Sequence, residues 1–387
     1  MYHIAKHEKD IGWTPAEGDV TNYRFTRTRS LDEHAKALSN WHQQYDQISP
    51  GKFEGYFAEA WFDDVQVLRE WTRPSVLQQG RAANESLTIV VPISMSKPGL
   101  FCGQQFTSDS IIVFSSEYVF SFVAPADCDI VATAIPQSYL AQFAENNYGI
   151  GEKLLRGSAP IVLNPSDLCL YEIKSLLIQL LNGRNKYSDA KIIDNDHAVI
   201  KDVILGKVGS ALASSSPSTL PSSSFKGRSY IVRQVVEYAI SRIPDVPAIS
   251  EICQNAKINR RLLNHSFHDV LGIRPLSYFR YLRLNGFRRE LIARYNDPVL
   301  IGDIAARWGF WHLSRLATEY KELFGELPSE TMKCYRKKSN GEVNAGRTQE
   351  ESKETLNKIQ TLRSRPCKIH LTPPTAKSNG SADTVDG

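Results

Sequence analysis

Two stretches of this chain resemble each other: ISEICQNAKINRRLLNHSFHDVLGIRP, residues 249–275, and IGDIAARWGFWHLSRLATEYKELFGELP, residues 301–328. When the second is laid on the first with one residue inserted near the middle, apolar and glycine or proline positions coincide in order from Ile249 with Ile301 to Pro275 with Pro328. Both stretches end in an apolar residue followed by Gly-x-x-Pro. This ordered agreement indicates one supersecondary unit that is used twice.

Each copy predicts a helix, a turn and a second helix. The first helix has apolar residues at i, i+3, i+4 and i+7, the spacing of a buried helix face; they are Ile249, Ile252, Cys253 and Ala256 in copy one and Ile301, Ile304, Ala305 and Trp308 in copy two. We therefore interpret Trp308 as a core residue. The second helix has only a narrow apolar edge, formed by Leu263 and Phe267 or by Leu316 and Tyr320.

The solvent side of each second helix is predicted to contact DNA. No acidic residue lies in its first turn, which suits a helix end that meets phosphates or base edges. The candidate contact residues are Arg260, Arg261, Asn264 and His265 in copy one, and Trp311, His312, Ser314, Arg315 and Thr318 in copy two. His265 and His268 lie three residues apart, but a metal site needs a further ligand, so we predict no metal here.

These residues resemble the DNA-binding domain of AraC/XylS-type transcriptional regulators. The resemblance runs from about Tyr230 to Tyr335, and its most specific part is Ile304-Ala305-x-x-x-Gly309-Phe310 followed by Phe324-Gly325-x-x-Pro328-Ser329. The chain has Gly286 where the family usually has Ala, and Leu316 where it usually has Phe. The resemblance implies a regulator, more often an activator, that binds double-stranded DNA, works with RNA polymerase and carries a cupin-like domain for a small organic effector.

Charge is divided along the chain in a way that fits this reading. Residues 228–338 have 19 Lys and Arg against 11 Asp and Glu, whereas residues 1–227 have 20 against 25. A phosphate-facing module needs such an excess of positive charge. Residues 275–294 predict a helix between the two copies that carries five arginines and fixes the spacing of the two recognition helices, so that both enter successive major grooves about 34 Å apart.

The N-terminal part predicts a β-barrel or sandwich. Alternating residues such as those at 53–57, 65–67, 87–91, 111–113 and 119–123 predict short strands separated by turns. A leading helix is expected from Leu31 to Tyr45, with Asp32 as its cap. Arg69 and Trp71 are our candidates for effector contacts, because basic and aromatic groups suit an organic anion.

A metal-dependent cupin enzyme is the competing hypothesis. Such a site uses two or three histidine ligands. No histidine occurs between His42 and His197. The sequence therefore predicts no metal, no cofactor and no enzymatic activity, and a DNA-architectural protein without an effector remains the other alternative.

Helical patterns follow the predicted strands at 138–147, 166–181 and 192–212. In the resembled family such helices usually dimerise, so we expect a homodimer; packing within one chain is the alternative. The start of the chain has no apolar run, and no stretch reaches 18 apolar residues, so neither a signal peptide nor a membrane span is expected. Six scattered cysteines without a C-x-x-C pair fit a reducing cytoplasm.

The predicted fold class is α+β: a cupin-like barrel or sandwich with a helical appendage, followed by an all-α domain with two helix-turn-helix motifs. Ser and Pro residues at 214–224 predict a flexible connection, since they cannot form a core. The polar end of the chain is predicted to be disordered. We expect five segments: a β-rich effector domain with its leading helix (1–135), a helical, dimerising appendage (136–213), a linker (214–227), an AraC-type DNA-binding domain (228–338) and a tail (339–387).

Overall fold

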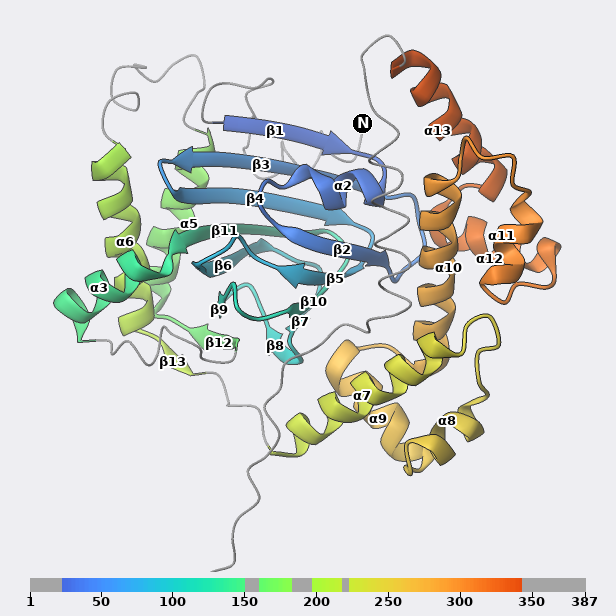
Figure 1. Cartoon of the computed structure of the whole chain (residues 1–387). Coiled ribbons are helices and arrows are strands. Elements are labelled where there is room, and N and C mark those ends of the chain that lie inside the picture. The colour runs from blue at the N-terminus through green and yellow to red at the C-terminus, as the bar shows by residue number, and fades with distance from the viewer. Residues whose placement is uncertain (1–22, 150–159, 183–196, 218–222, 343–387) are drawn as a thin grey trace, which may run out of the picture.

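The N-terminal part of the protein consists mainly of β-strands. Successive residues of a strand point to opposite faces, which explains the alternating pattern in the sequence. A computed structural model describes residues 23–149, 160–182, 197–217 and 223–342 (Figure 1). Its larger sheet contains, in spatial order, β1 (Tyr23–Thr28), β3 (Glu54–Phe62), β4 (Val65–Arg73), β11 (Cys128–Pro136), β6 (Ser86–Ser94), β9 (Ile111–Ser115), β12 (Ile161–Asn164) and β13 (Ser216–Pro217). Its smaller sheet contains β2 (His42–Gln47), β5 (Val76–Arg81), β10 (Phe120–Ala124), β7 (Gly99–Phe101) and β8 (Gln104–Phe106). Neighbouring strands are antiparallel throughout.

The larger sheet is buried on both faces. Helices α3 (Gln137–Tyr148), α5 (Asp167–Asn182) and α6 (His197–Ala213) cover one face, on the left of Figure 1. The smaller sheet covers the other. Along β4, Val67 and Trp71 therefore join the core beneath the helices, while Leu68 joins the core between the sheets. Strands that are buried on both faces need apolar side chains on both, which explains the high apolar content of these strands.

The three helices agree with the periodicity of the sequence. Within the described residues, α3, α5 and α6 overlap the predicted helices; residues 192–196 lie outside that part. Segment 136–213 also contributes β12, a strand that its pattern did not predict and that pairs with β9. No helix in the described ranges combines the length and apolar character needed to cross a membrane.

The predicted leading helix is wrong beyond its first two turns. Helix α2 spans Leu31–Ala37, and β2 begins at His42 after Asn40 adopts a left-handed conformation with φ 62°. Pairing of β2 with β5, together with burial of Tyr45 between the sheets, outweighs the helical spacing. Asp32 is not the cap either, because Ser30 occupies that position and makes no side-chain cap bond.

Seven helices form the C-terminal part within the described residues. They are α7 (Ser223–Ser241), α8 (Ile249–Asn255), α9 (Arg260–Leu271), α10 (Pro275–Ala293), α11 (Ile301–Arg307), α12 (Leu313–Phe324) and α13 (Pro328–Glu342). The first half of α10 packs in one core with α7, α8 and α9; its second half packs in another with α11, α12 and α13. Proline at the first position of α10 suits a helix start, since its missing N–H has no partner there.

The connection and the tail differ in part from the prediction. Residues 216 and 217 form β13 and pair with β12, and α7 begins at Ser223, inside the predicted linker. Helix α13 continues to Glu342, so the first residues of the predicted disordered tail are helical. Residues 218–222 and 343–387 lie outside the described part of the chain.

Polar contacts fasten α10 to β2, as the two elements lie side by side in Figure 1. The backbone N–H of Gln47 donates to Asn285 Oδ1 (2.9 Å), and Asn285 Nδ2 donates to the carbonyl oxygen of Gln47 (2.9 Å). Arg289 pairs with Asp46 on the same strand. Asn285 is buried, so these bonds are shielded from competing water.

Apolar contacts join the N-terminal part to the first motif copy. Leu77 of β5 lies in one core with Val232, Phe267 and Phe279, and Ile48 packs against it. The N-terminal part also contacts the second motif copy through a backbone hydrogen bond, in which Gly51 N–H donates to the carbonyl oxygen of Leu323 (3.1 Å). Both copies are therefore held against the two sheets of the N-terminal part, which we call the β body.

The Asn285–Gln47 pair predicts how firmly the two parts are joined. Asn285→Leu removes both partners of the Gln47 backbone, and each buried polar group left unpaired costs about 1–3 kcal/mol. We expect a lower urea midpoint by circular dichroism and faster limited proteolysis between the two parts. The matched control is Asn296→Leu at an exposed position, where a change within about 0.5 kcal/mol is expected. An unchanged midpoint for Asn285→Leu would show that the pair does not hold the parts together.

Candidate nucleic-acid interface

Helices α8 and α9 form the first helix-turn-helix unit. Lys257, with φ 53°, makes the left-handed turn between them. Helix α9 then starts at Arg260, and Asn259 caps it by accepting a hydrogen bond from the backbone N–H of Leu262 (2.8 Å). Because Leu263 and Phe267 are buried, the opposite side of α9 faces solvent.

The predicted contact residues of copy one lie on that exposed side. Arg260, Arg261, Asn264 and His265 are all exposed. A surface groove of about 700 Å³ runs beside them, lined by Ile249, Arg260, Asn264, His265, His268, Arg274, Pro275, Leu276 and Ser277. No carboxylate lines this groove, and two guanidinium groups do. Its chemistry therefore suits a polyanion.

Helices α11 and α12 form the second unit. Ile304 and Ala305 are fully buried, and Gly309 makes the turn with φ 74°; a Cβ there would meet the backbone oxygen of Pro244. Leu316 and Tyr320 anchor α12 in the core. Only glycine combines the positive φ at position 309 with the absence of a Cβ that would meet Pro244.

The predicted contact residues of copy two divide between α12 and the turn before it. Ser314, Arg315 and Thr318 are exposed on α12. Trp311 and His312 precede the helix, which starts at Leu313, so their assignment to the helix was wrong. Both are nevertheless exposed beside its N-terminus, and Trp311 is 65% exposed, an unusual position for a large ring unless a partner covers it.

A buried carboxylate fixes how the second unit sits on α10. Glu290 accepts hydrogen bonds from Trp308 Nε1 (2.7 Å) and from Arg307 Nε (2.7 Å). Arg294 Nε lies 3.2 Å from the same carboxylate. Trp308 is buried, as the sequence predicts, and its ring packs directly on Gly286.

The arginines of α10 bind other parts of the chain. Arg288 contacts Glu326 and lies 3.7 Å from Asp32, and Arg289 pairs with Asp46. Burial disfavours the charge on Arg288, but Tyr320, Asp32 and Glu326 outweigh it and raise the pKa of Arg288. The others also have intramolecular contacts: Arg280 with Glu322, Arg283 with Phe310 and Gly309, and Arg294 with Asp297. Helix α10 is thus a scaffold rather than a surface of free cations.

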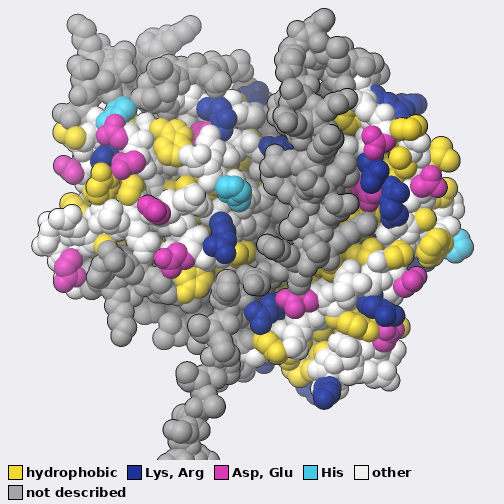
Figure 2. All heavy atoms as spheres, in the orientation of Figure 1, with side chains coloured by type: hydrophobic (Ala, Val, Ile, Leu, Met, Phe, Trp, Pro, Cys, Tyr) yellow, Lys and Arg dark blue, Asp and Glu magenta, His cyan; other side chains and the backbone are white. Residues whose placement is uncertain are grey.

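Basic side chains are spread over the C-terminal helices, on the right of Figure 2, with acidic ones among them. The metal alternative gains nothing from the geometry of α9, where His265 and His268 are both exposed. In the described part of the chain, no three His, Cys, Asp or Glu side chains come together as a metal site.

The effector candidates lie on the helix-covered face of β4. Arg69 makes a paired contact with Asp129, Nε to Oδ1 at 3.0 Å and Nη2 to Oδ2 at 2.8 Å, and both side chains are buried. Trp71 stacks on Tyr56 with ring centroids 5.7 Å apart. Both therefore face away from the space between the sheets.

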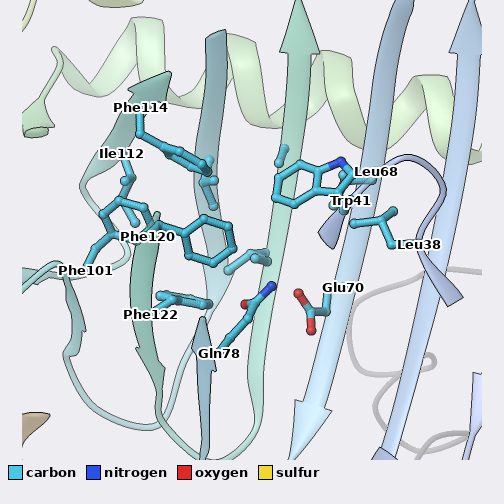
Figure 3. Close-up of a pocket in the computed structure, with 13 residues that line it drawn as sticks. Leu38, Trp41, Leu68, Glu70, Gln78, Phe101, Ile112, Phe114, Phe120 and Phe122 are labelled. Atoms are coloured by element: carbon cyan, nitrogen blue, oxygen red, sulfur yellow. The ribbon is translucent and has the colours of Figure 1, made fainter. Parts of the chain in front are cut away.

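A pocket between the sheets is lined by other residues (Figure 3). They are Leu38, Trp41, Leu68, Glu70, Gln78, Val90, Phe101, Ile112, Phe114, Phe120, Phe122, Ile130 and Ala132. Glu70 is the neighbour of Arg69 on the opposite face of β4. Strand alternation in the sequence predicts that Arg69 and Glu70 lie on opposite faces. It does not say which face of a doubly buried strand meets the second sheet.

Comparisons with known proteins concern mainly the C-terminal part. Residues 252–333 match the family model described as a helix-turn-helix domain. The probable thc operon regulatory protein of Rhodococcus erythropolis is 33% identical over 105 residues, 27% of this chain and 31% of that protein. The regulatory protein HrpB of Ralstonia nicotianae is 35% identical over 82 residues, 21% of this chain and 17% of that protein. The chain thus spans a third or less of these two relatives.

Another relative is covered more fully. The XylDLEGF operon transcriptional activator 2 of Pseudomonas putida is 29% identical over 105 residues, 27% of this chain and 67% of that protein. Among solved structures, the AraC-like transcriptional activator CuxR is 15% identical with a TM-score of 0.38, covering 75% of this chain and 100% of that chain. ToxT from Vibrio cholerae is 14% identical with a TM-score of 0.26, covering 81% and 98%.

Two helix-turn-helix units on one shared helix define a DNA-binding module of the transcriptional-regulator class. The family match and the relatives confirm the resemblance seen in the sequence. The C-terminal segment is similar to the helix-turn-helix domains of these regulators.

The contact between Gly286 and Trp308 predicts the effect of restoring alanine. A Cβ at 286 would overlap the buried indole, so Gly286→Ala should destabilise the protein by about 1–3 kcal/mol. Helix propensity alone predicts the opposite, a gain of up to about 1 kcal/mol. Gly302→Ala in α11 is the control, since its Cβ meets only Leu313 at 3.7 Å. Urea denaturation should also show that Trp308→Leu relieves much of the cost of Gly286→Ala; additive effects would refute the steric explanation.

Proposed function

We propose that this protein is a sequence-specific transcriptional regulator, an activator, that binds double-stranded DNA with two recognition helices and responds to a small organic effector. One observation carries the proposal most directly. All nine predicted contact residues are exposed at two similar helix starts, and α10 joins the two units rigidly. Neither α9 nor α12 has an acidic residue in its first turn, which suits contact with phosphates or base edges.

Recognition would follow the chemistry of the exposed side chains. Arg261 and Arg315 suit guanine, Asn264 suits adenine, and Trp311 suits a thymine methyl group. Arg315 already pairs with Glu319 (2.8 Å) along α12, so it must exchange that exposed partner for DNA. Surface pairs of this kind are weak, typically about 0–1 kcal/mol, and do not prevent the exchange.

Activation and cellular location are part of the same proposal. Several relatives are named transcriptional activators, which supports activation and a contact with RNA polymerase. Such a protein works where the DNA is, so we place it in the cytoplasm.

We also propose that the regulator is a homodimer joined through α5 and α6. Their outer faces expose Leu168 (67%), Tyr171 (69%), Val199 (53%) and Val203 (43%). Two adjacent helices with exposed apolar side chains favour an interface over a free surface. A second copy of the same helices offers a matching apolar face.

The alternatives have less support. A cupin-type enzyme would need metal ligands in the barrel. Glu70 is the only carboxylate among the residues that line the pocket, and His34 Nε2 lies 3.0 Å from it, but no three His, Cys, Asp or Glu side chains of the described residues come together as a metal site. A DNA-architectural protein needs no effector pocket. Metal analysis of the purified protein and a thermal-shift screen of small molecules separate these alternatives from the regulator.

Arginine substitutions test sequence-specific recognition. Arg261→Ala or Arg315→Ala should weaken binding to a site selected from a random DNA pool by about 1–3 kcal/mol, because a bidentate base contact is lost. Fluorescence anisotropy at fixed salt measures the change. Arg81→Ala, an exposed arginine of β5 outside both helix-turn-helix units, is the control and should leave affinity unchanged. Equal weakening on random DNA would show that these side chains contact only phosphates.

A charge on α5 tests the dimer. Leu168→Glu should convert a dimer into a monomer in analytical ultracentrifugation, because a carboxylate would be buried in an apolar interface. Leu300→Glu, 72% exposed between α10 and α11, should leave the oligomeric state unchanged. A wild-type protein that sediments as a monomer at all concentrations would refute this interface.

A further inference from the structure

We propose that the pocket between the two sheets binds a small organic cation, whose ammonium group pairs with Glu70. This inference rests on the proposed function, because it names the class of effector. It replaces the organic anion that Arg69 suggested. Arg69 lies on the other face of β4, where Asp129 of β11 neutralises its charge.

Aromatic rings form most of the pocket wall. Phe101 and Phe120 stack with centroids 5.9 Å apart, and Phe114 lies 5.2 Å from Phe120. Trp41 closes the side nearest α2 and is fixed by a hydrogen bond from Nε1 to Gln66 Oε1 (2.9 Å). The faces of such rings carry partial negative charge and attract cations.

Glu70 supplies a full negative charge at the edge of this aromatic wall. Figure 3 shows its carboxylate and the amide of Gln78 facing each other below the rings. Its Oε1 accepts a hydrogen bond from Tyr45 (2.9 Å) and lies 3.0 Å from His34 Nε2. Its Oε2 has no hydrogen-bond partner among the described residues, although the side chain is only 7% exposed. This oxygen is therefore available to a donor that enters the pocket.

The neighbours of Glu70 leave that oxygen to a ligand. Burial, followed by the charge of Glu70 and the hydrogen bond with it, raises the pKa of Tyr45 well above its usual value, so Tyr45 stays a neutral donor. His34 also contacts Thr28 Oγ1 through Nδ1 (2.8 Å) and stacks on Phe57 (4.2 Å). Each is committed to Oε1 or to the core.

The pocket discriminates by charge. No Lys or Arg side chain lines it. An anionic ligand would lie against the Glu70 carboxylate with no Lys or Arg in the lining, since His34 contacts Oε1 but is not a lining residue; a neutral apolar ligand would leave Oε2 unpaired. An ammonium group donates to Oε2 and contacts the ring faces, so it meets both demands.

The pocket also limits size. Its free volume is about 20 Å³, little more than a single water molecule requires. A sugar or a fatty chain does not fit between these rings as they stand. An alkylammonium ion of two carbons needs the ring side chains to move apart, so the proposal is limited to the smallest ions of this class.

Titration of the full-length protein with three matched probes tests the proposal. Ethylammonium, ethanol and acetate have similar size and differ in charge; ligand-observed NMR at constant ionic strength measures their binding. We expect saturable binding of ethylammonium, at least tenfold tighter than that of ethanol or acetate. Glu70→Gln should weaken it at least tenfold. Asp64→Asn, an exposed carboxylate beyond the pocket, should leave it unchanged.

Three results would overturn the proposal: acetate binding as tightly as ethylammonium, no saturable binding of ethylammonium, or full binding by a folded Glu70→Gln protein. If circular dichroism shows that Glu70→Gln does not fold, Ala132→Val replaces it, because added methyl groups fill the pocket without changing its charge. Unchanged ethylammonium binding by that variant would also overturn the proposal. Affinity for the selected DNA site is measured separately, so a protein that binds the cation but no DNA refutes the proposed function alone.

Discussion

The docking of α10 on β2 is the constraint on which the rest of the arrangement depends. Both helix-turn-helix units are built on α10, one on each half, so the position of that helix sets the position of both recognition helices. Asn285 fastens it by pairing with both backbone groups of Gln47. Those groups are not free to pair with another strand, because the hydrogen bonds are buried and directional. The β body therefore determines how the two DNA-reading surfaces are presented.

Strand β2 and helix α2 connect the pocket to α10. Glu70 is contacted by Tyr45 of β2 and by His34 of α2. One residue further along β2, Asp46 pairs with Arg289, and two residues before His34, Asp32 lies near Arg288. A ligand that binds Glu70 thus acts on segments that touch the DNA-binding part directly. Such a ligand shifts the arrangement only by the difference between its affinities for two states, and this short route is where that difference would arise.

The sequence failed where two buried environments compete for one strand. Arg69 and Glu70 are adjacent and both are buried, and only the packing of helices on one face and a second sheet on the other separates an internal ion pair from a pocket carboxylate. Trp41 misled for a related reason. Its spacing continued a helical period, yet α2 ends at Ala37 and the residue after Trp41, His42, begins the strand that pairs with β5. The arginines of α10 have a surface-like composition, and their acidic partners come from segments distant in the chain.

By itself the sequence determined the duplicated helix-turn-helix units, their exposed edges and the strand-rich N-terminal part. These features follow from local periodicity and turn residues such as Gly309, which act over a few positions. Tertiary structure alone decided that α10 is a scaffold held by the β body, and that Glu70 rather than Arg69 faces the pocket. Both depend on contacts between residues far apart in the chain, and burial makes such contacts strong while leaving no periodic trace in the sequence.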